Sequence, residues 1–210
     1  MHPFDELLEN NKKWAHEKVT LDPDYFKRLS EQQAPKFLWI GCSDSRVPAN
    51  EITNTEPGEI FVHRNVANMV VHTDLNLITV MEYAVNILQV EHVLVVGHYG
   101  CGGVKAALTN HNYGIINRWL KHIKDVYRFH RDEIDAIPTE EGRTDRLVEL
   151  NVIEQVMNLA KTTTIQEAWH KDKRPHLHGW VYGLKDGLIN PVFHMEPGSH
   201  IDPIFEYKME

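Results

Sequence analysis

The sequence has few of the features that mark secreted or membrane-embedded proteins. Only 2 of its 210 residues are cysteine, which is too few for a disulfide framework. No apolar run approaches the roughly 20 residues that a membrane helix needs. Residues 1–14 lack the basic start and the apolar block of a signal peptide. We therefore expect a cytoplasmic protein that does not enter a membrane.

Positive charge is also scarce. The 22 lysine and arginine residues are outnumbered by 30 aspartate and glutamate residues, which gives a net charge of −8. No basic stripe stands out, so a nucleic-acid partner is not expected, and an acidic surface disfavours anionic membranes. The apolar fraction of 42% is enough for a sizeable core. These values suit one compact domain, alone or with appended helices.

Apolar patterning predicts strands that alternate with helices. Short buried runs predict strands at 36–41, 58–65, 91–97 and 176–184, with a weaker edge strand at 191–196. Helical spacing is found at 74–88, with Thr73 as the expected N-cap, from 101 to 108, across 115–135 and at 144–160. The alternation predicts an α/β fold with a mostly parallel central sheet of four strands plus an edge strand, flanked by helices.

Residues 1–34 differ from the rest because they carry spaced apolar side chains among many charges. The pattern predicts one or two amphipathic helices, broken near "LDPD". We expect residues 1–34 to form an N-terminal helical arm, which packs on its own domain or on a partner subunit. Residues 35–210 would then form the α/β domain.

The two cysteines follow two of the predicted strands. Cys42 comes directly after "FLWIG", and His98 and Cys101 come directly after "VLVVG". Open α/β sheets bind ligands at the carboxyl ends of their strands, so the three side chains converge if these strands are neighbours. Two thiolates and one imidazole form a Cys₂His set, an arrangement known for catalytic zinc with an open fourth position.

Asp44 and Arg46 stand close to Cys42 in "CSDSR". The Asp44 carboxylate has two uses beside a metal ion: it fills the fourth coordination position, or it accepts a hydrogen bond from water on the metal. Arg46 favours the second use. A bidentate pairing with its guanidinium would hold the carboxylate away from the ion.

Other kinds of site compete with catalytic zinc for these residues. A structural zinc site would normally add a fourth cysteine or histidine, and a disulfide between Cys42 and Cys101 is disfavoured in a reducing compartment. A redox dithiol normally uses a C-x-x-C pair. A phosphate loop needs a lysine where Gly103 stands, and a cysteine phosphatase loop needs a wider spacing than that from Cys42 to Arg46.

Longer segments carry a resemblance to a known family. "CSDSRVPAN", "HRNVANMV" and "GHYGCGGV" resemble signature segments of the β-carbonic anhydrases, and the similarity continues through "LNVIEQVMNLA" and "HGWVYGLKDG". The resemblance implies Zn²⁺ on Cys42, His98 and Cys101, with Asp44 and Arg46 as an active-site dyad. It also implies hydration of CO2 to bicarbonate and a proton. Self-association is implied as an obligate dimer, often a dimer of dimers, in which the N-terminal helices embrace the partner.

One branch of that family, often called type II, adds a regulatory feature. There the residue matching Asp44 binds zinc in a closed, inactive state, and a non-catalytic bicarbonate lies near a tryptophan, an arginine and a tyrosine. This sequence has Trp39, Arg64 and Tyr182 at the matching places. The alternative is that Trp39 is a core aromatic and Tyr182 an ordinary strand residue.

Two further functions fit the same ligands. A related zinc hydrolase acting on CS2 or COS would differ in its substrate tunnel or its oligomer. A non-catalytic zinc-binding protein would keep Asp44 as a permanent fourth ligand, which the presence of Arg46 disfavours. The histidine pair in "HLHG", His176 and His178, would need further ligands, which the sequence does not locate, to form a second metal site.

Overall fold

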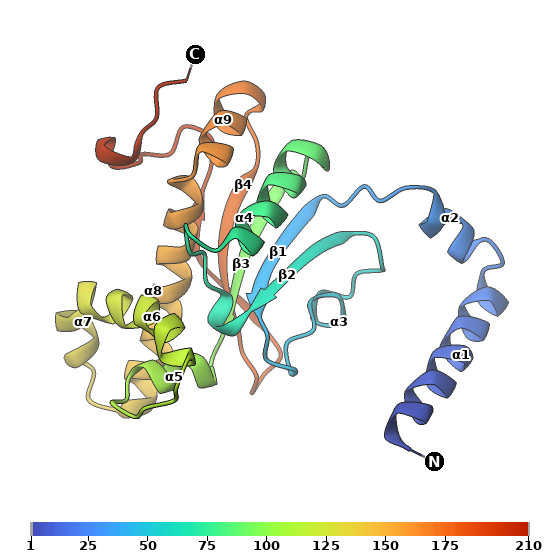
Figure 1. The fold of residues 1–210 in the computed structure, drawn as a ribbon, viewed down its shortest axis with the longest axis horizontal. Helices are drawn as coiled ribbons and strands as arrows, with labels where there is room; N and C mark the ends of the chain where they lie inside the picture. The colour runs from blue at the N-terminus through green and yellow to red at the C-terminus, as the bar shows by residue number, and fades with distance from the viewer. Residues whose placement is uncertain (1, 210) are drawn as a thin grey trace. The chain divides into compact units, whose positions relative to one another are not determined.

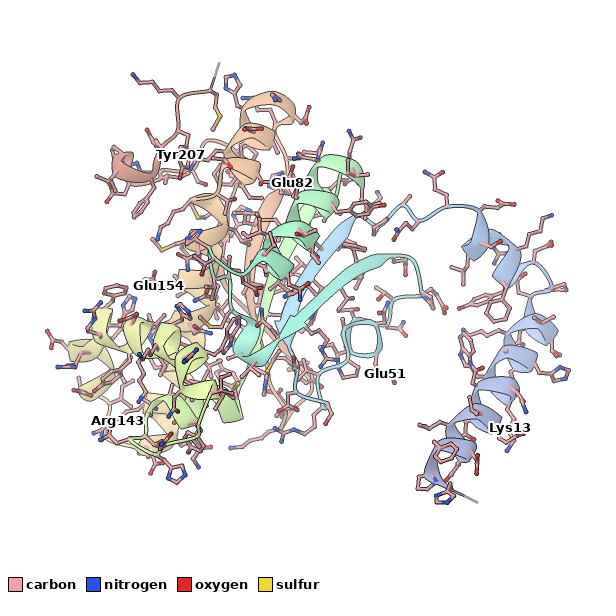
Figure 2. All side chains as sticks on the ribbon, viewed as in Figure 1. Lys13, Glu51, Glu82, Arg143, Glu154 and Tyr207 are labelled. Atoms are coloured by element: carbon pink, nitrogen blue, oxygen red, sulfur yellow. The ribbon has the colours of Figure 1, made fainter. Side chains whose placement is uncertain are left out.

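The computed structural model describes residues 2–209, drawn as a ribbon in Figure 1 and with side chains in Figure 2. The chain divides into two compact units, with the boundary between Ala34 and Pro35. None of the described helices combines the length and the apolar character that crossing a bilayer demands.

The N-terminal unit consists of α1, Pro3–Leu21, and α2, Tyr25–Glu31. Asp22 follows α1 directly and forms an ion pair with Arg28 of α2 across the turn. The ring of Trp14 packs edge to face against the first residue of α2, with centroids 6.4 Å apart. The two helices broken near "LDPD" are therefore confirmed.

The unit that starts at Pro35 is built on a five-stranded sheet. Its strands are β1, Phe37–Cys42; β2, Ile60–Asn65; β3, His92–His98; β4, His176–Tyr182; and β5, Ile189–Met195. Their spatial order is β2-β1-β3-β4-β5, and β5 is antiparallel to β4 while the other neighbours are parallel. The expected sheet of four parallel strands plus an edge strand is confirmed.

Helices gather mainly on one face of this sheet (Figure 1). The long helix α8, Glu140–Ala160, packs against β3, β4 and β5 over the main core. The opposite face carries a smaller apolar cluster around Trp39, Leu94 and Val96. The other helical elements are α3, Ala49–Thr53; η1, Val66–Asn68; α4, Leu75–Glu82; η2, Tyr83–Ile87; α5, Gly102–Ala107; α6, Ile116–Phe129; α7, Arg131–Asp135; α9, Thr163–Asp172; and η3, Pro203–Phe205.

Two helices differ from the sequence-based expectation. The N-cap of α4 is Asp74 and not Thr73, because the Asp74 carboxylate accepts a hydrogen bond from the Asn76 amide. Helix α9 was not expected, since its buried apolar face is short and rests largely on Ile165 and Trp169. Burial against the rest of the domain stabilises a helix whose own pattern is weak.

Candidate metal centre

The expected ligands lie where two neighbouring parallel strands end. Cys42 is the last residue of β1, His98 is the last of β3, and the two strands pair directly. Strand β2 continues the sheet on one side of this pair and β4 on the other, so the pair is the switch point where open α/β sheets bind ligands. After β3 the chain turns at Gly100, which has a φ of 68°. The turn places Cys101 at the N-cap of α5.

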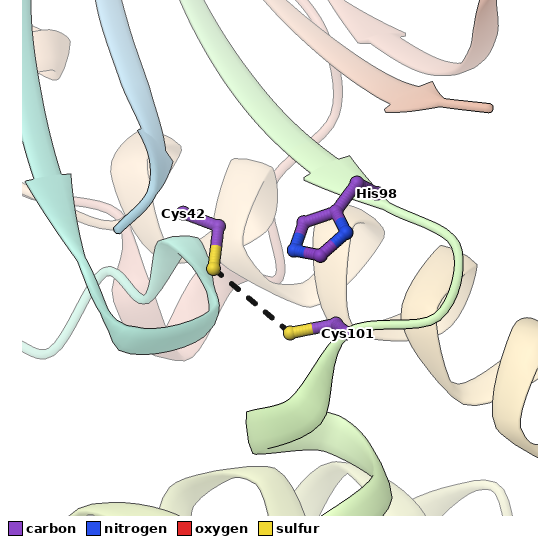
Figure 3. Close-up of side chains that lie close together, drawn as sticks. All are labelled: Cys42, His98 and Cys101. Atoms are coloured by element: carbon purple, nitrogen blue, oxygen red, sulfur yellow. Dashed lines mark hydrogen bonds between the residues drawn. The ribbon is translucent and has the colours of Figure 1, made fainter. Parts of the chain in front are cut away.

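The three side chains meet in a buried cluster, which Figure 3 shows. Their candidate ligand atoms all lie within 4.8 Å of one another, and the sulfurs of Cys42 and Cys101 are 3.9 Å apart. Two sulfurs held at about 2.3 Å from one tetrahedral zinc ion are separated by about 3.8 Å. The observed spacing fits a shared ion, and both cysteines are free thiols.

His98 is oriented as a metal-ligating histidine would be. Its Nδ1 lies 3.0 Å from the carbonyl oxygen of Tyr99, so Nδ1 carries the proton and donates it there. This tautomer leaves the Nε2 lone pair free, and Nε2 is fully buried with no hydrogen-bond partner among the described residues. A buried nitrogen acceptor is costly to leave unpaired, and a cation between it and the two sulfurs would satisfy it.

The contact between the two thiols moves their pKa values in opposite directions. The contact with Cys101 lowers the pKa of the Cys42 thiol. The same contact, together with burial, raises the pKa of the Cys101 thiol. A divalent cation offsets the repulsion between two negative sulfurs, and a coordinating thiol is deprotonated outright. The donor set therefore matches a doubly charged ion that prefers sulfur.

Asp44 borders the cluster but is held by Arg46. Its Oδ1 accepts from the Arg46 backbone amide at 3.0 Å and from Nε at 2.9 Å, and its Oδ2 accepts from Nη2 at 2.7 Å. This fork holds the pKa of Asp44 well below its usual range. Asp44 Oδ2 is also 3.7 Å from His98 Nε2, so the carboxylate lies at the edge of the cluster.

Arg64 supports the loop that carries both the first ligand and the dyad. It lies on β2 beside Gly41 of β1, and its guanidinium donates to the backbone carbonyls of Cys42 and Asp44. The structure therefore places Arg64 close to the metal cluster, with its donors directed to this loop.

The other two expected regulatory residues share one sheet face with Arg64. Trp39 is fully buried, and its indole N–H has no hydrogen-bond partner among the described residues. A Cβ on Gly41 would lie 2.2 Å from that nitrogen, so the indole covers the residue beside Arg64 in the ladder. Tyr182 ends β4 and packs at the margin of the same small cluster. No hydrogen bond between described side chains joins these three residues.

The turn after β2 belongs to the site, although we did not identify its supports from sequence. Ala67 and Asn68 have φ values of 63° and 48°, a backbone conformation that costs a non-glycine residue about 1–3 kcal/mol. Two buried side chains of α8 hold the turn: Asn151 donates to the Ala67 carbonyl and Gln155 accepts from the Val70 amide. In the sequence, the signal for these supports was the presence of two polar residues, four positions apart, on an otherwise apolar helix face.

That turn packs directly against the second ligand segment. A Cβ on Gly103 would lie 2.9 Å from Cγ1 of Val66, so only glycine allows the two segments to approach this closely. Trp119 of α6 donates its indole N–H to the Val66 carbonyl at 2.7 Å. The position of Cys101 therefore depends on a close backbone approach that helices α6 and α8 stabilise.

A cavity lies beside the dyad. It has a volume of about 670 Å³, and its lining includes Arg46, Tyr99, Gly100, Lys105 and Lys185. The cavity therefore reaches the arginine of the dyad.

Comparison with known proteins agrees with the resemblance of the signature segments. Residues 37–189 match the family model described as carbonic anhydrase. The chain is 50% identical over 198 residues to a carbonic anhydrase of Emericella nidulans, which covers 94% of this chain and 87% of that protein.

Solved structures extend the similarity to the fold. A tetrameric β-carbonic anhydrase from Sordaria macrospora, 40% identical, matches 90% of this chain and 96% of its own with a TM-score of 0.87. A Coccomyxa β-carbonic anhydrase in complex with acetazolamide, 38% identical, matches 91% and 87% with a TM-score of 0.86. The chain therefore belongs to the β-class carbonic anhydrases, the enzymes of reversible CO2 hydration.

Proposed function

We propose that the chain hydrates CO2 with a zinc ion held by Cys42, His98 and Cys101. One observation carries this proposal: the buried Nε2 of His98, which has no hydrogen-bond partner in the described part of the chain, faces two free thiols whose sulfurs are 3.9 Å apart. Zinc bound there would lower the pKa of a water ligand toward neutrality and so supply hydroxide as the nucleophile.

Asp44 positions the attacking oxygen. Arg46 occupies Oδ1 twice and Oδ2 once, which leaves acceptor capacity on Oδ2, the atom nearest His98. Because its lowered pKa keeps the carboxylate ionised, Oδ2 accepts the hydrogen of the oxygen nucleophile and directs a lone pair toward CO2. Arg46 thereby acts as a positioning residue, through Asp44.

The same carboxylate provides a switch. Asp44 pairs with Arg46 in this structure, and by turning toward a bound metal ion the carboxylate would block access of water to that ion. Hydroxide would compete with the carboxylate for the ion, so alkaline solution would favour the pairing with Arg46. Asp44 remains charged over this whole range, so the pH dependence arises from the competitor and not from titration of Asp44.

Bicarbonate regulates this switch through Arg64 in our proposal. The Arg64 guanidinium holds the carbonyls of Cys42 and Asp44, and a nearby anion would compete for its donors. The buried indole N–H of Trp39 offers a further donor on the same face of the sheet, and Tyr182 lies on that face as well. An anion that draws Arg64 away releases the loop and lets Asp44 reach the metal.

The test is stopped-flow CO2 hydration across pH, with zinc quantified on the same sample. We expect about one zinc per chain in protein freed of loosely bound metal, loss of activity on chelation, and rates that rise from mildly acidic to alkaline pH. Activity that persists without metal would refute the zinc assignment. A rate that is flat across this pH range would refute the Asp44 switch alone. A matched CS2 or COS assay identifies the related hydrolase.

A further inference from the structure

Four histidines gather on one face of the sheet, at the end opposite the Cys₂His cluster. His92 starts β3 and is paired in register with His176, the first residue of β4, while His178 is paired with His194 of β5. The ring centroids of His92 and His176 are 5.6 Å apart, and those of His178 and His194 are 5.1 Å apart. Since β3 runs seven residues from His92 to the ligand His98, this group lies about 20 Å from the first site.

Two of these histidines join a carboxylate in a ligand-like arrangement. The candidate ligand atoms of His176, His194 and Glu196 all lie within 4.8 Å of one another, and His176 Nδ1 is 3.9 Å from Glu196 Oε2. Ligands held at about 2.0–2.2 Å from one tetrahedral ion are about 3.4 Å apart, so modest side-chain rotation closes the set. The side chains of His176 and Glu196 are 40% and 59% exposed, which leaves them free to rotate.

The remaining histidines act as a supporting layer. His92 Nδ1 and His178 Nε2 lie 3.1 Å apart and form a hydrogen bond, so these two atoms are committed to each other. Their rings pack against those of His176 and His194. Such contacts orient ligand rings, as second-layer groups do at metal sites.

We propose that His176, His194 and Glu196 form a second metal site, which binds a first-row divalent cation such as Zn²⁺. A His₂Glu set is an established zinc donor set, and mixed nitrogen and oxygen donors suit first-row divalent metals. The ion links β4 to the edge strand β5 and its following turn. It stabilises that edge of the sheet and takes no part in the hydration step.

The test counts zinc bound to the zinc-loaded enzyme at equilibrium with rising free Zn²⁺. Without added metal, the zinc content per chain reports the Cys₂His site alone. Absence of zinc from the Cys₂His site is therefore distinguished from absence of binding at the second site. We expect wild type to take up a second equivalent, and His194→Ala and Glu196→Gln to bind it at least roughly tenfold more weakly. The matched control is His200→Ala, which removes an exposed histidine outside the group and should retain the second equivalent.

Two further readouts separate coordination from non-specific uptake. Zn²⁺ should raise the melting temperature of wild type above that of the zinc-loaded enzyme alone, and should not do so for His194→Ala. Cu²⁺ added to the zinc-loaded enzyme should show two nitrogen ligands by electron paramagnetic resonance in wild type and one in His194→Ala. Saturation of wild type at one zinc per chain, or an unweakened second equivalent in both ligand variants, would overturn the proposal.

Discussion

At the scale of single residues, the site depends on pairs whose members determine each other's state. Arg46 binds both carboxylate oxygens of Asp44, and the Tyr99 carbonyl fixes the tautomer of His98. As a result, a lone pair on Asp44 Oδ2 and a lone pair on His98 Nε2 both face the space beside the two sulfurs. Changes to the partner residue therefore alter chemistry without removing a ligand.

Arg46→Ala tests the Asp44 pair. Without the fork, Asp44 is free to stay on the metal, so we expect kcat/KM to fall on the order of 10²-fold while zinc content stays at one per chain. Arg46→Lys keeps the charge but loses the bidentate geometry. Its kcat/KM should therefore lie between those of wild type and Arg46→Ala. Loss of zinc from Arg46→Ala would show instead that Arg46 is a structural support.

Arg64→Ala tests the proposed bicarbonate control. Hydrogen bonds to a charged group contribute about 1.5–3 kcal/mol, so the bicarbonate concentration for half-inhibition should rise roughly tenfold or more. The rate without bicarbonate should fall as well, because the carbonyls of Cys42 and Asp44 lose the same donors. The measurement is CO2 hydration at several pH values with added bicarbonate, and chloride at equal ionic strength is the control. Unchanged bicarbonate inhibition with an unchanged pH dependence would remove Arg64 from the regulatory site.

At the scale of elements, helix α8 stabilises both the core and the metal loop. Its apolar residues pack against β3, β4 and β5, while Asn151 and Gln155 reach the left-handed turn after β2. These polar residues are about 1% exposed, so their hydrogen bonds lie where water does not replace them. The strained turn persists because the helix is rigid.

Gln155→Leu should destabilise the fold by about 1–3 kcal/mol, because it leaves the buried Val70 amide without its acceptor. Urea denaturation of the zinc-loaded enzyme measures the loss. Glu154→Leu is the matched control on the neighbouring, partly exposed position of α8, where the hydrogen bond to His130 is less buried. Equal losses in both variants would show that the turn does not depend on Gln155.

At the scale of the whole molecule, helix α1 carries an exposed apolar face. Phe4, Leu7 and Leu8 of α1 are 61%, 69% and 61% exposed, which is unusual for large apolar side chains on one helix. A similar protein from Sordaria macrospora is described as tetrameric. We propose that a second copy of the chain covers these residues, giving a dimer or a tetramer. Cytoplasmic location stays a prediction.

Leu7→Asp combined with Leu8→Asp should weaken that assembly, because burial of each leucine contributes about 1.5–3 kcal/mol. Light scattering after size exclusion should show a smaller species than wild type at the same concentration. Asn10→Asp with Asn11→Asp adds the same charge to exposed positions of α1 and is the control. An unchanged molar mass in the leucine variant would exclude this face from the interface.

The sequence by itself determined the class of sheet and the chemical type of the site. Apolar runs and helical spacing are local, so β1, β3 and α8 were predictable to within a few residues. A metal site was indicated by two cysteines and a histidine, each of which follows a predicted strand. The signature segments indicated the family of the protein. The Asp74 cap was missed because Thr73 and Asp74 are adjacent and both are favoured N-cap residues, and helix α9 was missed because its apolar pattern is short.

Only the tertiary structure decided which of these residues meet. Cys42 and Cys101 are 59 residues apart, yet their sulfurs lie at 3.9 Å, because β1 and β3 are neighbours in an order that no local pattern encodes. Asn151 reaches Ala67 for the same reason. The antiparallel return of β5 likewise brings His194 and Glu196 to His176, supplying the ligands that the sequence could not locate. The sequence determines which side chains are present, whereas long-range packing determines which of them come into contact.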